Sequence, residues 1–295
     1  MIDLMPLTLK SKEIVSPYFK NITNSVYNFT TAFLWGGEKY VKYSIIDGSL
    51  VLFYEYPKSP LCASYPLGDG DKRSAILFAC DYMKSKGVTP VFRNLSPFMA
   101  DELKSLFPNE FEYIPDRNAF DYIYETKKLI DLSGKELHSK RNHYNYFKKT
   151  YNYKYLKMTQ DDTRECKALF DKWIEGKERT KWLEASREAT FKALDNLNEL
   201  ALTGGVIKVG NEICAFSLGE AVSFDTALIH FEVALSGLRG AFNAINCEFC
   251  ANEWKDFTYI NREEDMGIEN LRKTKEAYKP VFLLEKINAV LKNSC

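Results

Sequence analysis

The stretch from Tyr259 to Met266 holds the densest group of side chains that could bind an anion or transfer a proton. Its apolar start is typical of a strand, and an unbroken polar run containing Asn261, Arg262 and Asp265 follows. Sites in α/β sheets usually lie at the carboxyl ends of strands. We therefore interpret Asn261 and Arg262 as substrate-binding candidates and Asp265 as a candidate for proton transfer. A charged surface loop is the alternative.

A basic helix is predicted directly after this run, from Glu269 to Tyr278. Arg272 and Lys275 are three residues apart and Lys279 follows four residues later, so the three side chains lie near one helix face. That face suits a phosphate or carboxylate, and Arg272 and Lys275 are the candidates to bind it. An amphipathic surface helix with ordinary salt bridges is the alternative.

A second basic segment, from Gly134 to Tyr151, is predicted to be a helix and contains Lys140, Arg141 and Asn142. It holds five Lys or Arg residues against one Glu, interleaved with tyrosines. Basic and aromatic side chains in alternation suit phosphate contacts and base stacking. The segment is therefore a candidate anion-binding surface, and a solvated helix that links two domains is the alternative.

The predicted strand from Thr226 to Ala234 carries His230 and Glu232, which alternation places on one face of the strand. If this face lines a site, the pair supplies a general base or a substrate clamp. If it faces the core, both are hydrogen-bonded structural groups. The sequence leaves both interpretations open.

A turn from Ser236 to Gly240 leads into a predicted helix that starts at Ala241. The free N–H groups and the dipole of a helix start favour an anion. Gly237 and Gly240 are therefore candidates for binding the phosphate of a donor substrate.

Motifs for covalent, nucleotide or metal chemistry do not occur in the sequence. There is no Walker loop, dinucleotide fingerprint, nucleophile elbow or HExxH. Cys247 and Cys250 form a CxxC spacing, but no second pair or suitably spaced histidines accompany it, so buried reduced thiols are expected and no metal site is predicted. Catalysis would be direct transfer by positioning and proton relay, without a covalently bound cofactor.

The elements that must position these residues occur twice in the same order. The first half predicts helices within 9–34, a hairpin over 40–56 around Asp47-Gly48, a strand at 61–65, a helix at 72–86, a strand at 88–92, a helix at 97–106 and strands within 111–124. The second half predicts helices at 161–176 and 183–198, a hairpin over 205–219, the strand at 226–234, and then helix 241–254, strand 257–260, helix 269–278 and strand 281–285. We infer an α/β (α+β) fold with two mixed sheets flanked by helices, divided into domains 1–128 and 129–295, with the basic linking helix 134–151 in the second.

Composition excludes several classes of protein. The 40 basic and 40 acidic residues balance, so attraction to nucleic acid or anionic lipid must come from a local patch. The sequence shows neither a secretory signal nor a run of roughly 18 apolar residues. We therefore expect a cytoplasmic protein without an integral membrane segment.

These segments resemble the family of the C-terminal catalytic domain of phosphatidylglycerol lysyltransferase, a tandem acetyltransferase-like (GNAT) domain akin to the Fem-type nonribosomal peptidyltransferases. The resemblance covers nearly the whole chain. It is carried by Asp121-Tyr122-Ile123-Tyr124, Leu132-Ser133-Gly134-Lys135, Lys140-Arg141-Asn142 with Phe147, His230-Phe231-Glu232, Ala244-Ile245-Asn246, Asn261-Arg262-Glu263-Glu264-Asp265-Met266-Gly267, Leu271-Arg272-Lys273 and Tyr278-Lys279-Pro280.

This resemblance implies an aminoacyl- or acyltransferase. It would move an acyl group from aminoacyl-tRNA or acyl-CoA to an amine or hydroxyl of a small-molecule, peptide or lipid acceptor, in the cleft between the two units. Arg262, Arg272 and Lys275 would neutralise the donor, with Lys140, Arg141 and Asn142 nearby, and Asp265, Glu232 or His230 would handle the acceptor proton.

Two other functions remain open at this point. One is a non-catalytic protein that binds an anionic ligand or RNA. The other is a plain acetyl-CoA N-acetyltransferase, although the turn before Ala241 lacks a clean Arg/Gln-x-x-Gly-x-Gly/Ala phosphate loop.

Overall fold

The computed structural model describes residues 4–292, which divide into two compact units. The first unit contains the residues up to 121, the segment 264–267 and the residues from 284 onward; the second contains 122–263 and 268–283. The predicted boundary between 128 and 129 therefore differs from the observed one. The chain returns twice to the first unit, so a single boundary along the sequence cannot describe this division.

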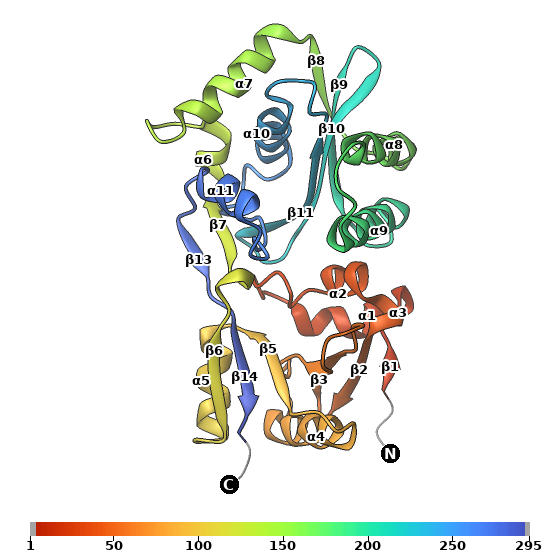
Figure 1. The fold of residues 1–295 in the computed structure, drawn as a ribbon, viewed down its shortest axis with the longest axis vertical. Helices are drawn as coiled ribbons and strands as arrows, with labels where there is room; N and C mark the ends of the chain where they lie inside the picture. Colours follow the sequence, from red (N-terminus) through yellow and green to blue (C-terminus); the bar gives the residue numbers. More distant parts are fainter. Residues whose placement is uncertain (1–3, 293–295) are drawn as a thin grey trace. The chain divides into compact units, whose positions relative to one another are not determined.

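The first unit is built on a seven-stranded mixed sheet (Figure 1). In sheet order its strands are β1 (Met5–Pro6), β2 (Val41–Ile46), β3 (Ser49–Tyr54), β4 (Cys62–Ala63), β5 (Val91–Leu95), β14 (Ile287–Leu291) and β6 (Phe111–Pro115). The predicted hairpin is confirmed: Ile46 pairs with Ser49, and Asp47 and Gly48 between them have φ of 47° and 81°. Positive φ at both turn residues is what a two-residue type I′ turn requires.

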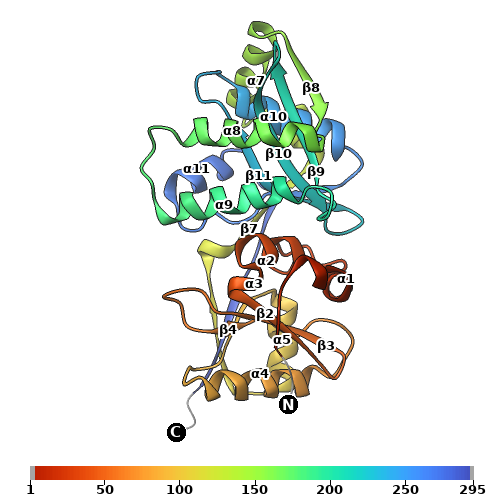
Figure 2. The same cartoon turned by 90° about the vertical axis from the view of Figure 1, so that its right-hand side faces the viewer.

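The helices of the first unit cover both faces of its sheet. They are α1 (Lys12–Val15), α2 (Phe29–Trp35), α3 (Gly37–Tyr40), α4 (Lys72–Ser85) and α5 (Pro97–Leu106). Figures 1 and 2 show α4 and the group α1–α3 on opposite sides of β2 and β3. The carboxylate of Asp71 caps α4 by accepting from the Ser74 N–H, and the Ser96 hydroxyl caps α5 in the same way.

The second unit has a seven-stranded mixed sheet of its own. In sheet order its strands are β13 (Phe282–Leu284), β7 (Asp121–Glu125), β12 (Tyr259–Asn261), β11 (Thr226–Ala234), β10 (Glu212–Ala221), β9 (Thr203–Val209) and β8 (Tyr153–Lys157). β8 was not predicted, because its alternating Tyr and Lys residues lie at the sheet edge and carry little apolar signal.

The helices of the second unit are α6 (Thr126–Asp131), α7 (His138–Thr150), α8 (Thr163–Ile174), α9 (Lys181–Asp195), α10 (Ala241–Glu253) and α11 (Glu269–Glu276). Figure 1 shows α10 on one side of β10 and β11 and α8 with α9 on the other, and Figure 2 shows α8 and α9 side by side. The α/β prediction with two mixed sheets flanked by helices is confirmed.

Each sheet contains one parallel pair of consecutive strands that soon separates. In the first unit β4 and β5 pair in parallel only at Ala63 and Phe92. In the second, β11 and β12 pair from Thr226 to Leu228, after which β11 continues to Ala234 while β12 ends at Asn261. Residues that follow the point of separation lie at the carboxyl ends of parallel strands, where α/β sheets place their sites.

Candidate functional site in the second unit

A buried charge cluster lies where β11 and β12 separate. Arg262, the first residue after β12, donates from Nη2 to Oε1 of Glu232 on β11 at 3.1 Å. Asn246 on α10 donates from Nδ2 to the other carboxylate oxygen, Oε2, at 3.0 Å. Burial lowers the pKa of Arg262, but the charge of Glu232 outweighs it and the net pKa is raised, so the guanidinium stays charged.

Two polar atoms of this cluster are left without a partner. Nη1 of Arg262 and Oδ1 of Asn246 are both buried, and neither makes a hydrogen bond within residues 4–292. A buried polar group without a partner costs about 1–3 kcal/mol, and a ligand or an ordered water that pairs with it would remove this cost. The cluster therefore presents one unused donor and one unused acceptor, each held in place by the same carboxylate.

Tyr278 brings the two predicted basic segments together. Lys140 on α7 places Nζ 4.6 Å from the centre of the Tyr278 ring, and the guanidinium carbon of Arg262 lies 4.9 Å from the same centre. The Tyr278 hydroxyl accepts from Nδ2 of Asn243 at 2.7 Å. Burial, and then the charge of Arg262, lower the pKa of Lys140, so its amine releases a proton more readily than a surface lysine.

The turn that carries Arg262 is held by buried side chains. Oδ1 of Asn261 accepts from the Glu263 N–H at 2.7 Å, and Glu263 has a φ of 56°. Nζ of Lys275 donates to the carbonyl oxygens of Arg262 and Glu263 at 2.6 and 3.1 Å. These contacts show that Asn261 and Lys275 support the turn, and their predicted role as substrate contacts stays a prediction.

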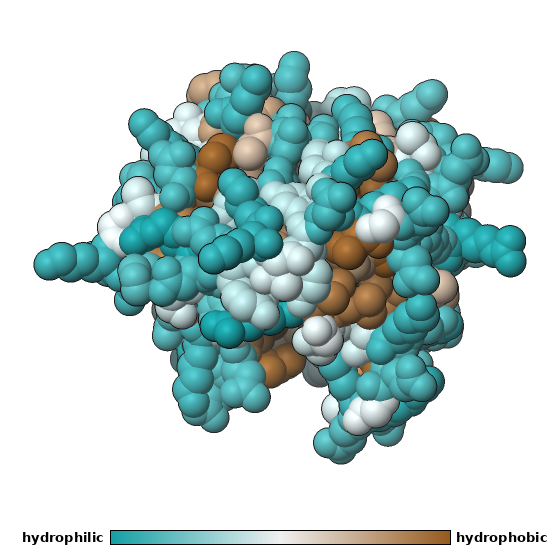
Figure 3. Space-filling model, turned by 90° about the horizontal axis from the view of Figure 1, so that it is seen from above, coloured by the Kyte–Doolittle hydropathy of each residue, from teal (hydrophilic) through white to brown (hydrophobic). Residues whose placement is uncertain are grey.

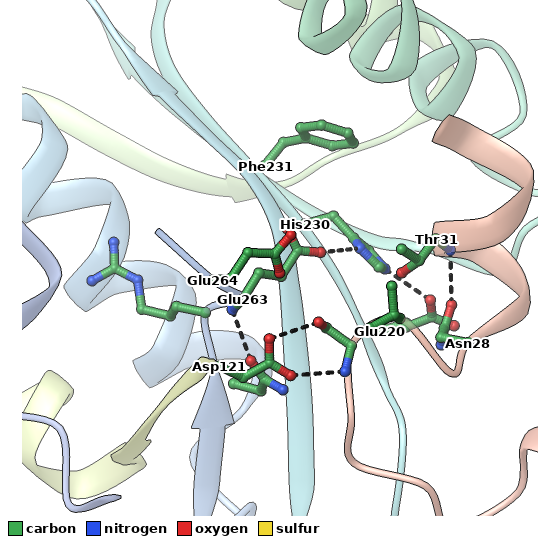
Figure 4. A network of polar contacts seen from close by, with 12 residues as sticks. Asn28, Thr31, Asp121, Glu220, His230, Phe231, Glu263 and Glu264 are labelled. Carbon is green, nitrogen blue, oxygen red and sulfur yellow. Dashed lines mark hydrogen bonds and ion pairs between the residues drawn. The ribbon is translucent and has the colours of Figure 1, made fainter. Parts of the chain in front are cut away.

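His230 lies between two carboxylates, as Figure 4 shows. Its Nε2 is 2.8 Å from Oε1 of Glu220 and its Nδ1 is 3.0 Å from Oε1 of Glu263. Both ring nitrogens face carboxylate oxygens, which favours a proton on each nitrogen. Burial lowers the pKa of His230, but the bonds to Glu220 and Glu263 outweigh it and raise the pKa to about 9. An imidazole that is mostly protonated at neutral pH does not suit the general-base role that the sequence suggested.

His230 makes stability depend on pH. Its pKa is raised from 6.5 to about 9 in the folded chain, so the unfolded chain loses the proton first as pH rises. The stabilisation is complete below pH 6.5 and is lost as pH rises toward 9. Between these values the unfolding constant should rise by up to about tenfold per pH unit from this group. Urea titrations at several pH values test this, and His230→Gln should remove that part of the slope; an unchanged slope in the variant would contradict it.

The remaining candidates from the sequence lie outside the cluster. Asp265 belongs to the first unit, where its buried carboxylate accepts from Arg117 Nη1 at 3.2 Å and from the Gly267 N–H at 2.8 Å. Arg141 on α7 donates to the carbonyls of the segment that follows α6, and Asn142 contacts His138 on the exposed surface of α7. Arg272 lies partly buried on α11. Sequence reasoning missed Asn246 as a site residue because its position fits ordinary helix periodicity.

Gly240 begins α10 with a φ of 90°, in contact with α7. A Cβ at this position would lie 2.2 Å from the His143 carbonyl oxygen, so α7 closes this approach to the helix start. A Cβ at Gly237 would meet no atom within 4 Å, and the φ of this glycine is not positive. Gly240 therefore packs closely against α7, and the phosphate-binding role of the two glycines stays a prediction.

Alanine substitutions at Gly240 and Gly237 should have different effects on stability. Gly240→Ala is expected to lower the free energy of unfolding by about 1–2 kcal/mol from the left-handed backbone alone, with a further loss from the clash against α7. Gly237→Ala, the matched control, should leave stability unchanged. Urea denaturation of both variants measures this, and equal stabilities would contradict the tight contact at Gly240.

The described cysteines are buried thiols. Cys62, Cys80, Cys166, Cys214, Cys247 and Cys250 are free, and Cys295 lies outside the described residues. Burial, and then Glu248, raise the pKa of Cys247 to about 12, so its thiolate is scarce at neutral pH. Within residues 4–292 no three His, Cys, Asp or Glu side chains gather in a way that could hold a metal ion.

No helix in the described part of the chain is long and apolar enough to cross a bilayer. The face drawn in Figure 3 is covered mainly by hydrophilic residues, with apolar ones visible in separate patches between them. That face carries no continuous apolar surface.

The chain resembles several solved structures over nearly its whole length. A conserved protein of unknown function from Bacteroides thetaiotaomicron VPI-5482 is 32% identical, with a TM-score of 0.92 over 99% of this chain and 100% of that one. L-PGS from Bacillus licheniformis has 16% identity and a TM-score of 0.69, covering 100% and 95% of the two chains. FemX has 12% identity and a TM-score of 0.64, covering 99% and 98%. The chain therefore shares its fold with L-PGS and FemX. A family model described as phosphatidylglycerol lysyltransferase, C-terminal, matches residues 19–290, and the chain therefore belongs to this family.

Proposed function

We propose that the second unit transfers an aminoacyl group from aminoacyl-tRNA to an amine or hydroxyl at the Arg262–Glu232–Asn246 cluster. The observation that carries this proposal is the pair of buried, unpartnered atoms, Nη1 of Arg262 and Oδ1 of Asn246. An aminoacyl ester has a carbonyl oxygen that accepts a hydrogen bond and an α-ammonium that donates them. Arg262 would bind the carbonyl oxygen, and Asn246 would accept from the ammonium.

The transfer itself needs one nucleophile and one proton acceptor. The amine or hydroxyl of the acceptor attacks the ester carbonyl carbon, negative charge develops on the carbonyl oxygen beside the Arg262 guanidinium, and the bond to the tRNA ribose oxygen then breaks. The ribose oxygen leaves with a proton, and the acceptor gives one up. A preorganised charge at the developing oxyanion is commonly the largest catalytic contribution.

Lys140 is our candidate for the proton transfer. Its pKa is lowered by burial and by Arg262, and it contacts the same tyrosine ring as Arg262. His230 is held as an imidazolium by two carboxylates, and Glu232 is engaged by Arg262 and Asn246. Lys140 thus combines a depressed pKa with a place at the cluster.

Two features favour aminoacyl-tRNA over acyl-CoA. A simple acyl group has no ammonium, so it would leave Oδ1 of Asn246 buried without a donor. A site that is built to form a hydrogen bond with its ligand rejects ligands that cannot form this bond. The carbonyl oxygen of His143 also closes one approach to the start of α10, where a CoA pyrophosphate would seek N–H groups.

The proposal is tested by measuring donor consumption by the full chain. Radiolabelled aminoacyl-tRNAs and acetyl-CoA are each offered with phosphatidylglycerol vesicles, the acceptor that the family description suggests, and with a lysine-containing peptide. Transfer of label from aminoacyl-tRNA to either acceptor is expected. Consumption of acetyl-CoA instead would show that the protein is an acetyltransferase. Retention of tRNA on filters without any consumption would show that it binds tRNA without catalysis. Either result would overturn the proposal.

A further inference from the structure

The first unit contains a cavity of about 310 Å³ at the carboxyl ends of its own parallel strand pair. Segments 21–24 and 65–68, the start of α4, the start of α5 and Leu284 line it. The volume falls at the lower end of the range for small-ligand pockets, and the crevice beyond the ends of parallel strands is where α/β sheets bind ligands. In the second unit the equivalent place holds the Arg262–Glu232 ion pair. The wall of the first unit's cavity contains no arginine.

The wall of this cavity is largely apolar and carries no net charge. Leu67 and Met99 are buried in it, and Phe98, which is 74% exposed, stands at its edge. The charged side chains of the wall are Lys72 and Glu102, and Nζ of Lys72 lies 2.9 Å from both carboxylate oxygens of Glu102. A charged ligand would have to compete with this pair, whereas an uncharged one leaves it intact.

Tyr65 adds a hydrogen-bonding group to this wall. Its side chain is 1% exposed, and its hydroxyl makes no hydrogen bond of ordinary length and angle within the part of the chain that the structure describes, although the Glu102 carboxylate lies close enough to interact with it. Burial, and then the interaction of the hydroxyl with the Glu102 carboxylate, raise the pKa of Tyr65, so the hydroxyl keeps its proton and remains a donor. We propose that this cavity binds an uncharged small molecule with an apolar body and one carbonyl-type acceptor that pairs with Tyr65.

Three matched probes test the proposal by fluorine NMR on the full chain: para-fluorobenzamide, para-fluorobenzoate and para-fluorotoluene. The amide is expected to bind best, because it alone combines neutrality with an acceptor. Tyr65→Phe should weaken amide binding about two- to tenfold, the worth of one hydrogen bond, and leave toluene binding unchanged. Phe98→Ala, at an exposed position that does not threaten folding, should weaken both.

Arg262→Gln, in the second unit, should leave amide binding unchanged, which separates this site from the proposed transferase site. Benzoate binding as tight as the amide would overturn the uncharged chemistry. Absence of amide binding at millimolar concentration, or binding that neither Tyr65→Phe nor Phe98→Ala alters, would overturn the site.

Discussion

Arg262→Gln should lower the rate of aminoacyl transfer by roughly 100- to 1,000-fold, as the loss of one preorganised oxyanion donor does in other enzymes. The guanidinium is charged, nearly buried and bonded to Glu232 through Nη2, and its Nη1, which makes no hydrogen bond to any residue from 4 to 292, would serve the carbonyl oxygen. Single-turnover kinetics with radiolabelled aminoacyl-tRNA measures the effect. Arg187→Gln is the matched control, since Arg187 also pairs with a carboxylate, Asp171, but on the surface.

A second variant keeps this test independent of folding. Arg262→Gln leaves Glu232 buried without its cation, which destabilises the unit. Combining it with Glu232→Gln removes the stranded charge, so the double variant should recover stability, as judged by urea denaturation. It should remain inactive. Activity near that of the unchanged chain in either folded variant would exclude Arg262 from the reaction.

Lys286→Met should lower the free energy of unfolding by about 3–5 kcal/mol, the usual cost of removing one partner of a buried ion pair. Nζ of Lys286 lies 2.6 Å from Oδ1 of Asp121 and 2.9 Å from Oγ of Ser25, and Lys286 and Asp121 are 1% and 0% exposed. Figure 4 shows Asp121 and Glu264 in this network; Oε2 of Glu264 is 3.5 Å from Lys286 Nζ. Without the lysine, the buried Asp121 carboxylate loses this cation and keeps the neutral donors of Ser25.

Urea denaturation measures this loss against a surface control. Lys273 and Glu269 form an ion pair on α11 with both side chains largely exposed, so Lys273→Met should change stability little. Asp121→Asn added to Lys286→Met should restore part of the stability, since the buried charge is gone. A loss no larger for Lys286→Met than for Lys273→Met would show that the pair contributes little.

The fold was predictable wherever a signal is local. Asp47 and Gly48 are sufficient to predict the turn that they form, and Asp71 and Gly87 mark the start and the end of α4. The apolar residues of β11 predict a strand. The place of β14 was not predictable, because its pairing with β5 and β6 joins residues that are 172 to 199 positions apart. Strand order in a sheet depends on such long-range pairings, and the order of elements along the chain does not reveal them.

The candidate site shows the same division. Arg262 follows from its position after a strand and Glu232 from alternation along its strand, and the structure joins them directly. The environment of His230 depends on Glu220, which β10 brings alongside β11 with a register shift between Leu218 and Gly219. Because a bulge resets which side chains face each other, the two carboxylates around His230 could not be read from alternation.

The position of β14 bears on how the protein is made. The first sheet has β14 between β5 and β6, so during synthesis those two strands emerge from the ribosome long before the strand that separates them. Both expose unpaired edges until residue 291 has been added, a state in which partly made chains tend to associate with each other. The amino-terminal half therefore cannot complete its structure first, and nascent chains should depend on chaperone protection throughout translation.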